Sequence, residues 1–354
     1  MLIFDAHLDL SMNAIDWNRD LRLPADKIRQ EEEGMTDRRG RGTGTVTFPD
    51  MRQGGVGLCV GTLIAPCARP ENPIAGWNSP EQAWAQINAQ LEWYRTMESA
   101  GEISLVHDSP GLRSTVDIWT GNTEAKPIGV IISLEGADPI LNFGQLETLH
   151  AAGLRALGPA HYGPGRYANG TNSTGGLPSH GRDLIREMDR LGIILDVTHL
   201  CDDCFWEALE IYDGPVWASH SNCRSLVDHN RQFSDDQLKV LFDRKAVIGA
   251  VMDTWMMVEG WIKGESAPES AGADLNRLVD HIDHICQLAG SAAHCGIGSD
   301  LDGGFGAEQS PADLGTIAGL ARFAEILSDR GYAQGDVEAI MHGNFVGFLE
   351  RTWA

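Results

Sequence analysis

Residues that can bind a metal ion recur at the ends of short apolar segments in this 354-residue sequence. Such side chains close six of eight segments, at His7 and Asp9, Glu135, His161, His199, His220 and Asp300. Imidazole and carboxylate groups together suit Zn²⁺ or a similar divalent ion. One histidine alone would usually be a hydrogen-bonded core residue, but the shared placement of this set favours a metal site.

The set is too large for one tetrahedral site, so we expect two ions. His7 and Asp9 are two residues apart in a strand and face the same way, so they can hold one ion together. His199 and His220 would hold the second, and Glu135 would lend one oxygen to each. Two ions roughly 3.5–4 Å apart lower the pKa of a water shared between them and polarise a carbonyl group. The pattern predicts hydrolytic chemistry.

The segments that position these side chains are short, rich in Val and Ile, and separated by helical patterns, which is typical of parallel βα units. They are residues 2–9, 56–64, 128–135, 154–161, 193–199, 216–220, 246–252 and 296–300. Eight such strands close most naturally into an α/β fold, the (β/α)₈ TIM barrel, whose catalytic residues lie at the carboxyl ends of the strands. We expect residues 1–354 to form a single barrel domain.

Serine and glycine residues bound the helical patterns between the strands. Three examples run from Ser79 to Gly101, from Ser179 to Gly192 and from Ser310 to Gly331. In each the serine is the expected N-cap or first residue, and the glycine is the expected stop. The proline that follows Ser79 and the one that follows Ser310 suit the first helical position.

Two polar, glycine-containing stretches, residues 11–50 and 162–178, do not follow this pattern. Each comes after the carboxyl end of a strand, so a barrel places both on its catalytic face, where long loops shape the substrate pocket. For residues 11–50 a mobile surface excursion agrees equally well with the sequence.

Composition excludes several classes of partner. The net charge of −23 leaves no basic patch for nucleic acid. The chain begins without the pattern of a signal peptide, and no apolar run approaches the roughly 18 residues that span a bilayer. Seven cysteines, an odd number, favour reduced thiols. We therefore expect a cytoplasmic protein that acts on a small molecule away from membranes. The sequence leaves the oligomeric state open, and a homodimer is compatible with it.

The chain resembles the membrane dipeptidase, or renal dipeptidase, family of binuclear zinc peptidases within the amidohydrolase-like, metal-dependent hydrolase barrels. The similar segments are Asp5-Ala6-His7-Leu8-Asp9-Leu10, residues 48–57, Ser133-Leu134-Glu135-Gly136, Asp196-Val197-Thr198-His199, Ala218-Ser219-His220-Ser221, residues 298–303 and Gly343-Asn344-Phe345. His-x-Asp on the first strand is specific, because most relatives of this barrel class carry His-x-His there and bridge with a modified lysine. The resemblance runs almost end to end.

This resemblance implies roles for individual residues. The zinc ligands would be His7, Asp9, Glu135, His199 and His220, holding two Zn²⁺ or other divalent ions. His161 would contact the reacting carbonyl of the substrate and Arg231 its terminal carboxylate. Asp300 would carry the proton from the bridging water to the leaving amine.

The sequence departs from the family in two places. Pro159-Ala160-His161-Tyr162 stands where the family has a Thr-His motif, and it precedes a long glycine-rich loop. The secretion signal and lipid anchor of the animal members are absent. In this the chain is similar to the bacterial branch, whose substrates include dipeptides with a D-residue at the C-terminal side.

The first hypothesis is therefore a dipeptidase in which a metal-bridging hydroxide attacks the peptide carbonyl. A second is another metal-dependent hydrolase on the same barrel, acting on amides, N-acyl amino acids or lactones. Arg231 discriminates between the two, because only substrates with a free carboxylate gain from a guanidinium. A non-catalytic binding protein that kept the barrel is a third reading, and no residue favours it.

Overall fold

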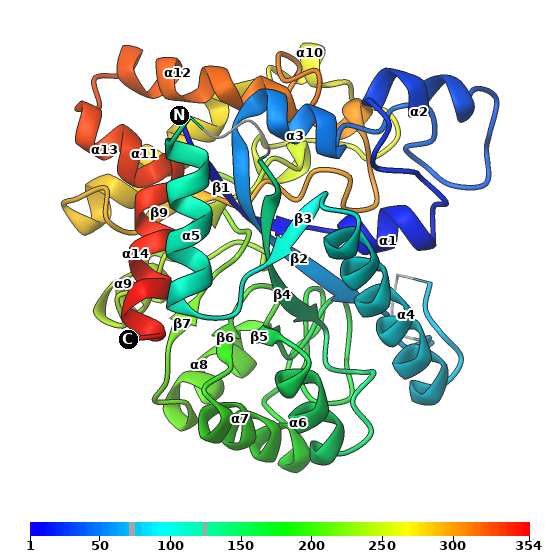
Figure 1. Ribbon diagram of the computed structural model, residues 1–354. Helices are drawn as coiled ribbons and strands as arrows, with labels where there is room; N and C mark the ends of the chain where they lie inside the picture. Colours follow the sequence, from blue (N-terminus) through cyan, green and yellow to red (C-terminus); the bar gives the residue numbers. More distant parts are fainter. Residues whose placement is uncertain (71–74, 123–125) are drawn as a thin grey trace.

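The computed structural model describes residues 1–70, 75–122 and 126–354. Within these ranges eight parallel strands form a nearly closed barrel with helices around it (Figure 1). They are β1 (Ile3–Leu8), β2 (Val56–Ile64), β4 (Ile128–Glu135), β5 (Leu154–Gly158), β6 (Ile194–Asp196), β7 (Val216–Trp217), β8 (Ile248–Ala250) and β9 (Cys295–Ile297). The barrel predicted from the sequence is confirmed, and each predicted segment contains or overlaps one of these strands.

The strand order follows the chain around the barrel, from β7 through β6, β5, β4, β2 and β1 to β9 and β8. The ring closes between β7 and β8. Ala218, directly after β7, forms a parallel bridge with Ile248, and its amide donates to the carbonyl of Val247 over 3.0 Å. All the strand residues in β1, β2 and β4 are buried, which explains why their sequences read as continuous apolar runs.

A short strand that the sequence analysis did not predict, β3 (Ile103–Leu105), pairs with β4. It lies beside the first half of β4, with Ile103 opposite Ile128, whereas β5 joins β4 only from Ile132 onward. β3 therefore fills the part of the β4 edge that β5 leaves open.

The helices connect successive strands on the outside of the barrel. They are α1 (Leu10–Ile15), α2 (Ala25–Glu31), α3 (Phe48–Gly54), α4 (Pro80–Ser99), α5 (Ser109–Thr120), α6 (Phe143–Ala151), α7 (Ser179–Leu191), α8 (Asp202–Ile211), α9 (Asp235–Asp243), α10 (Pro268–Ala271), α11 (Leu275–Ala289), α12 (Phe323–Asp329), α13 (Gln334–Glu338) and α14 (Asn344–Thr352). Short turns of 3₁₀ or π helix occur at η1 (Thr254–Met256), η2 (Ala307–Gln309), η3 (Ile317–Arg322) and η4 (Ala339–Gly343). Figure 1 shows α5 running beside α14, so the last helix packs against the first half of the chain.

Two of the three predicted helix boundaries agree with the structure. The Ser79 hydroxyl accepts a hydrogen bond from the Gln82 amide at the start of α4, and Gly101 follows that helix with φ +76°. α7 begins at Ser179 and ends at Gly192, which takes the left-handed conformation at the C-cap. Both glycines stand where a side chain would be strained.

The third helix was predicted with the wrong start, because no helix begins at Ser310, whereas its predicted stop, Gly331, follows α12 with φ +95°. The Ser310 hydroxyl donates to the carbonyl of Gly306 instead of capping a helix, and Gly315 has φ +74°, which interrupts a right-handed helix. The helical turn η3 starts only after Thr316, whose hydroxyl accepts from the Ala318 amide. A serine followed by proline is thus an N-cap only where the next residues can continue the helix.

Residues 11–50 are packed against the barrel by a buried arginine. Arg19 donates to both carboxylate oxygens of Glu32, over 2.8 and 2.9 Å, and to the Asn13 side chain. It also lies 3.3 Å from Asp302, in the loop after β9. Since Arg19 and Asp302 are both buried, these contacts tie the segment to the mouth of the barrel.

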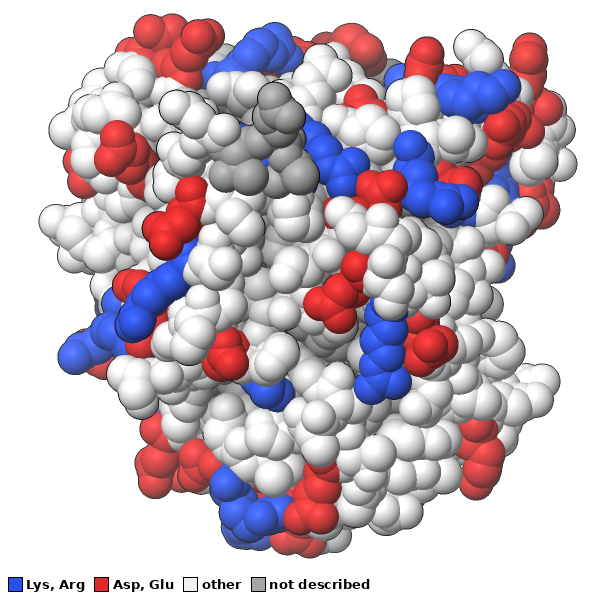
Figure 2. All heavy atoms as spheres, in the orientation of Figure 1, with Lys and Arg blue, Asp and Glu red and all other residues white. Residues whose placement is uncertain are grey.

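Charged side chains are distributed over the surface in both signs. Figure 2 shows Lys and Arg lying among Asp and Glu on the face that it presents. Ion pairs among the described residues include Arg52 with Glu102 and Arg330 with Asp283. Within the described part of the chain, no helix combines the length and apolar character needed to cross a bilayer.

Candidate metal centre and active site

The candidate ligands gather at the carboxyl ends of the barrel strands. His7 lies in β1 and Glu135 is the last residue of β4. The other proposed site residues follow strand ends directly or after a short turn, namely Asp9, His161, His199, His220 and Asp300. The structure therefore brings together all the side chains that the sequence analysis singled out by their position at strand ends.

Glu135 stands at the centre of the cluster with its two oxygens facing different histidines. Its Oε2 lies 3.6 Å from Nε2 of His7. Its Oε1 lies 3.3 Å from Nε2 of His199 and 3.5 Å from Nε2 of His220. This is the arrangement that a carboxylate needs to share two ions, one oxygen to each.

Three overlapping groups of side chains offer donor atoms within 4.8 Å of one another. His7, Asp9 and Glu135 form one, and Glu135, His199 and His220 form the second, with the glutamate common to both. His7 and His220 form the third with Asp300, whose Oδ1 lies 3.7 Å from Nε2 of His7. The first two groups match the pairing expected from the sequence.

Neighbouring hydroxyl groups hold the candidate ligands in orientation. Thr171 Oγ1 lies 3.0 Å from Nδ1 of His199, and Ser219 Oγ lies 2.8 Å from Nδ1 of His220. Thr62 donates from its hydroxyl to Oδ1 of Asp9. Because each imidazole is fixed through Nδ1, its Nε2 points into the cluster, as supporting contacts around metal ligands usually arrange.

The backbone is strained at two of these residues. His199 has φ +70° and Asp300 has φ +59°, in the left-handed region that side chains other than glycine rarely adopt. Such conformations persist where surrounding contacts fix them, and they cluster at functional sites. At both positions the strain occurs where a strand turns into the loop that presents the side chain.

Burial sets the electrostatics of the cluster. It lowers the pKa of His7, His199 and His220 well below the usual value, so these imidazoles are neutral and keep a lone pair for a metal. It raises the pKa of Glu135 and Asp300 well above the usual value, and the nearby charge of Asp9 adds to this. Several carboxyl groups so close together require positive charge to stay ionised.

The residues present fit a divalent metal centre. Nε2 of His7 is buried and has no hydrogen-bond partner among the described residues, although three carboxylate oxygens lie within 4 Å of it. A buried unpaired nitrogen is costly unless a further group binds it. Together with neutral imidazoles and a central carboxylate, it forms a donor set suited to zinc.

Arg231 extends the cluster toward a substrate. It follows β7, is only 3% exposed, and donates to the carbonyl of His220 over 2.9 Å and to Ser221 Oγ over 3.3 Å. Among the described residues no carboxylate lies within 4.0 Å of its guanidinium. The structure thus buries a cation beside the metal cluster without an ion-pair partner, so Arg231 is not a surface arginine.

His161 and Tyr162 reach the cluster from the loop after β5. Nε2 of His161 lies 3.9 Å from Oε1 of Glu135, and burial together with the charge of Arg231 lowers the pKa of His161 to about 3. The Tyr162 ring packs against His161 and His199. The loop folds back closely here, because a Cβ at Gly170 would lie 1.8 Å from the carbonyl oxygen of His161.

The sequence analysis missed Asp253. This residue follows β8 and lies between Arg231 and Asp300 in the sequence. The seventh predicted segment ended at Met252, one residue too early to include it. Asp253 is buried and accepts from Nε1 of Trp255 and Nε2 of Gln309, both over 2.7 Å. Tyr162 was also missed, and its place directly after His161 was the available signal.

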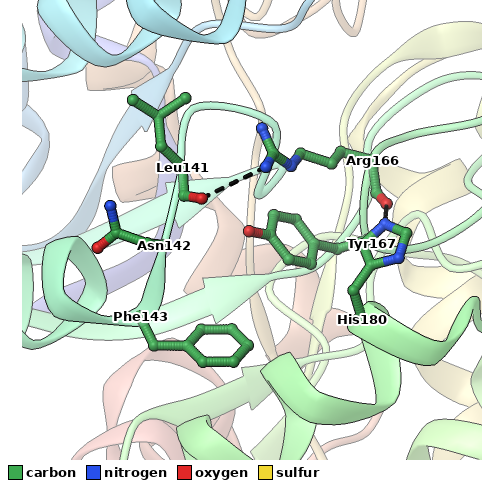
Figure 3. A pocket seen from close by; sticks show the side chains of 6 residues that line it. All are labelled: Leu141, Asn142, Phe143, Arg166, Tyr167 and His180. Carbon is green, nitrogen blue, oxygen red and sulfur yellow. Dashed lines mark hydrogen bonds between the residues drawn. The ribbon is translucent and has the colours of Figure 1, made fainter.

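A separate cavity of about 430 Å³ lies between α6 and α7. It is lined by Leu141, Asn142, Phe143, Arg166, Tyr167 and His180 (Figure 3). Arg166 donates there to the carbonyl of Leu141, and the Tyr167 hydroxyl donates to the carbonyl of Ile140. Among the described residues that line this cavity there is no carboxylate, so it lacks the donor set found in the candidate metal cluster.

Comparison with known proteins gives one family. Its model, described as membrane dipeptidase (peptidase family M19), matches residues 1–352. Dipeptidase verJ from Clonostachys rogersoniana is 31% identical over 231 residues, which cover 61% of this chain and 55% of that protein. The matched region thus spans about half the length of that relative.

Two solved structures are similar along the whole chain. Dipeptidase AC, a metallopeptidase of family M19, has a TM-score of 0.80 at 26% identity and covers 100% of this chain and 99% of that one. A metallopeptidase from Rhodobacter sphaeroides, bound to a phosphinate mimic of the dipeptide L-Ala-D-Ala, has a TM-score of 0.78 at 25% identity with the same coverage. Fold and sequence comparisons therefore agree.

Proposed function

This chain belongs to the membrane dipeptidase family (peptidase family M19), whose members are metal-dependent hydrolases, and we propose that it is a binuclear zinc dipeptidase. The resemblance noted from the sequence motifs is thereby confirmed at the level of the family. The proposal adds the number and identity of the metals, the roles of the residues and the class of dipeptide.

His7 and Asp9 would hold one zinc ion, and His199 and His220 the other. Glu135 would bridge them, since its two oxygens face the two pairs of ligands separately. When bound, the ions would lower the pKa of a water between them and polarise the carbonyl of the substrate. The neutral imidazoles and the central carboxylate support this assignment.

Asp300 would hold and move the proton. Its carboxylate faces the cluster from the loop after β9, 3.7 Å from His7, and its side chain keeps 15% of its surface exposed. From there it would accept the proton of the attacking water and deliver it to the leaving amine. His161, a neutral imidazole on the other side of Glu135, would donate a hydrogen bond to the reacting carbonyl oxygen.

The observation that carries the choice of a dipeptide is the buried Arg231. A guanidinium without an ion-pair partner among the described residues is expensive to bury, and a substrate carboxylate would compensate it. A substrate whose terminal carboxylate is one residue beyond the scissile bond would place that carboxylate at Arg231 while its scissile carbonyl lies at the metals. Arg231 thus favours cleavage directly before a C-terminal residue, as in a dipeptide, over cleavage within a long peptide.

We also propose that the substrates include dipeptides with a D-residue at the C-terminal side. The similar metallopeptidase from Rhodobacter sphaeroides was solved with a mimic of L-Ala-D-Ala. The metal centre would act only on the peptide carbonyl. Residues elsewhere in the site would therefore determine whether the second residue is accepted in the L or the D configuration.

The test compares free dipeptides with their C-terminal amides. A charge-assisted contact in a shielded pocket contributes roughly 2–4 kcal/mol, so Arg231→Ala should lower kcat/KM for free dipeptides by about 30- to 1000-fold. The wild type should already cleave the amides poorly, so the variant should change their kcat/KM little. Arg186→Ala is a control for the loss of one arginine, because Arg186 is exposed on α7 and pairs with Asp183 on the same helix.

A second function rests on the same metals and makes a different prediction. If the wild type cleaves amidated or longer peptides as well as free dipeptides, or if Arg231→Ala weakens both equally, the carboxylate contact is wrong. The chain would then be a broader hydrolase of amides, N-acyl amino acids or lactones.

A further inference from the structure

We propose that Asp253 and Gln309 form a subsite for a cationic side chain on the C-terminal residue of the substrate. The inference rests on the proposed dipeptidase function and deepens it. It assigns a preference for dipeptides that end in lysine or ornithine, whose ammonium group would lie against the Asp253 carboxylate.

The order of strands places this subsite beside the leaving residue. Arg231 follows β7 and Asp300 follows β9, and in the proposed function they contact the carboxylate and the amine of the C-terminal residue. Those two groups are bonded to the same Cα atom. β8 lies between β7 and β9 in the closed barrel, and Asp253 follows β8. A side chain on that Cα can therefore extend toward the wall that carries Asp253.

Asp253 is close to both groups in electrostatic terms. The charge of Asp253 raises the pKa of Asp300, and the charge of Arg231 lowers the pKa of Asp253. Tyr162 packs against His161 and His199. The charge of Arg231 lowers the pKa of Tyr162, and the charges of Asp253 and Asp300 raise it. These residues therefore surround one region of the catalytic face.

The subsite presents hydrogen-bond acceptors. Asp253 accepts one neutral donor on each oxygen, from Trp255 and Gln309, which leaves lone pairs free on both. Gln309 is fully buried, and its Oε1 has no hydrogen-bond partner among the described residues. A carboxylate and an unpaired carbonyl oxygen side by side are complementary to a group with several N–H donors.

Asp253 also has no ion-pair partner in contact with its carboxylate. It is 8% exposed, and in the described ranges no lysine, arginine or histidine lies within 4.0 Å of its carboxylate. The exposed Lys263 and the buried Arg231 lower the pKa of Asp253 only from beyond that distance. An ammonium group would satisfy the charge and the acceptors at once.

The experiment measures kcat/KM for alanyl-lysine and for alanyl-norleucine, each with the C-terminal residue in the L and in the D form. Norleucine has the same aliphatic chain as lysine without the ammonium. In the configuration that directs the side chain to Asp253, the wild type should prefer lysine by about 10- to 100-fold. Asp253→Asn should reduce that ratio to near one, and Gln309→Met, which keeps the charge, should reduce it less.

The exposed Asp236 on α9 supplies a control, since Asp236→Asn removes one charge at a distance and should leave the ratio unchanged. A wild type without preference for lysine in either configuration overturns the subsite, even if Asp253→Asn fails to fold. So does an Asp253→Asn variant that weakens lysine and norleucine substrates equally, because Asp253 would then contact a group common to all dipeptides. A wild type inactive on every dipeptide contradicts the proposed function itself, and the subsite with it.

Discussion

At the scale of single residues, the two metal sites depend on Glu135, because it is the only side chain common to the groups that contain Asp9 and His199. Glu135→Gln replaces one carboxylate oxygen with an NH₂ group that cannot bind a metal and removes the negative charge that both ions would share, so it should disturb both sites. We expect close to two zinc ions per chain in the wild type and fewer than one in the variant, by elemental analysis after zinc reconstitution. A wild type that is active with one ion at most contradicts the binuclear proposal.

Asp300 allows the proton transfer to be separated from metal binding. Asp300→Asn keeps the size of the side chain but removes the proton carrier, so kcat should fall by about 10²–10⁴-fold while the metal content stays near two. Steady-state kinetics and elemental analysis on the same sample give both values. Loss of metal together with activity would instead place Asp300 among the ligands, as its 3.7 Å approach to His7 permits.

The sequence predicted which residues meet at the metal centre because strand ends of a parallel barrel converge whatever the loops do. It did not predict what surrounds them. Thr171 and Ser219, which orient His199 and His220, are common residue types with no distinctive spacing. Asp253 was missed because the end of a strand is uncertain by a residue or two in any sequence pattern.

At the scale of elements, α11 is joined to two loops by a buried histidine. Its residue His281 is 1% exposed, accepts from the Cys223 amide through Nδ1, and lies 3.2 Å from the carbonyl of Met257 through Nε2. These contacts require the neutral imidazole, and burial lowers the pKa of His281 to about 4. A histidine in an outer helix is usually solvated, so the sequence pattern does not predict the buried position of His281.

The lowered pKa predicts acid sensitivity with a definite sign. Between pH 6.5 and about 4 the unfolded chain binds a proton at His281 that the folded chain does not, so this contribution to stability is present above pH 6.5 and is lost as the pH falls. The difference amounts to about 3 kcal/mol. Urea unfolding at pH 7 and pH 5 should therefore show a smaller pH dependence for His281→Gln than for the wild type.

His284→Gln is the matched control for this experiment, because His284 lies on the same helix and pairs with Asp235 at a partly exposed position. An unchanged pH dependence in His281→Gln would show that other groups cause the acid sensitivity.

The strand β3 and the late start of η3 could not be predicted from local sequence patterns, because each depends on residues that are distant in the chain. β3 needs the free half of the β4 edge, and η3 begins only after Gly315 has turned the backbone.

At the scale of the whole molecule, residues 11–50 are the clearest case of structure that local patterns do not reveal. Their charge runs resemble a solvated loop, yet Arg19 pairs with Glu32 and lies next to Asp302, far away in the chain. Asp302 also accepts from the amides of Thr45 and Val46. One buried carboxylate thus fastens the segment to the loop that carries Asp300, so its shape and that of the catalytic face are linked.

The proposed metal centre would link several strands of the barrel to one another, so we expect the metals to stabilise the fold. The proposed ligands come from β1 and the residue that follows it, from β4, and from the turns after the adjacent strands β6 and β7. β2 separates β1 from β4, and β5 separates β4 from β6. Without ions, Asp9 and Glu135 remain buried near one another with no cation between them. Ligands that bind only the folded state stabilise it by about 4 kcal/mol when free metal exceeds Kd 1000-fold, so chelation should lower Tm by roughly 5–10 °C. Differential scanning calorimetry with and without a chelator measures this shift in Tm, and added zinc should restore the original Tm.

Glu135→Gln should show a much smaller shift in Tm on chelation, whereas Arg231→Ala should keep the full shift, because Arg231 is assigned to the substrate. If chelation leaves Tm unchanged in a sample that has lost its zinc, the cluster does not hold the barrel together, and its residues serve catalysis alone.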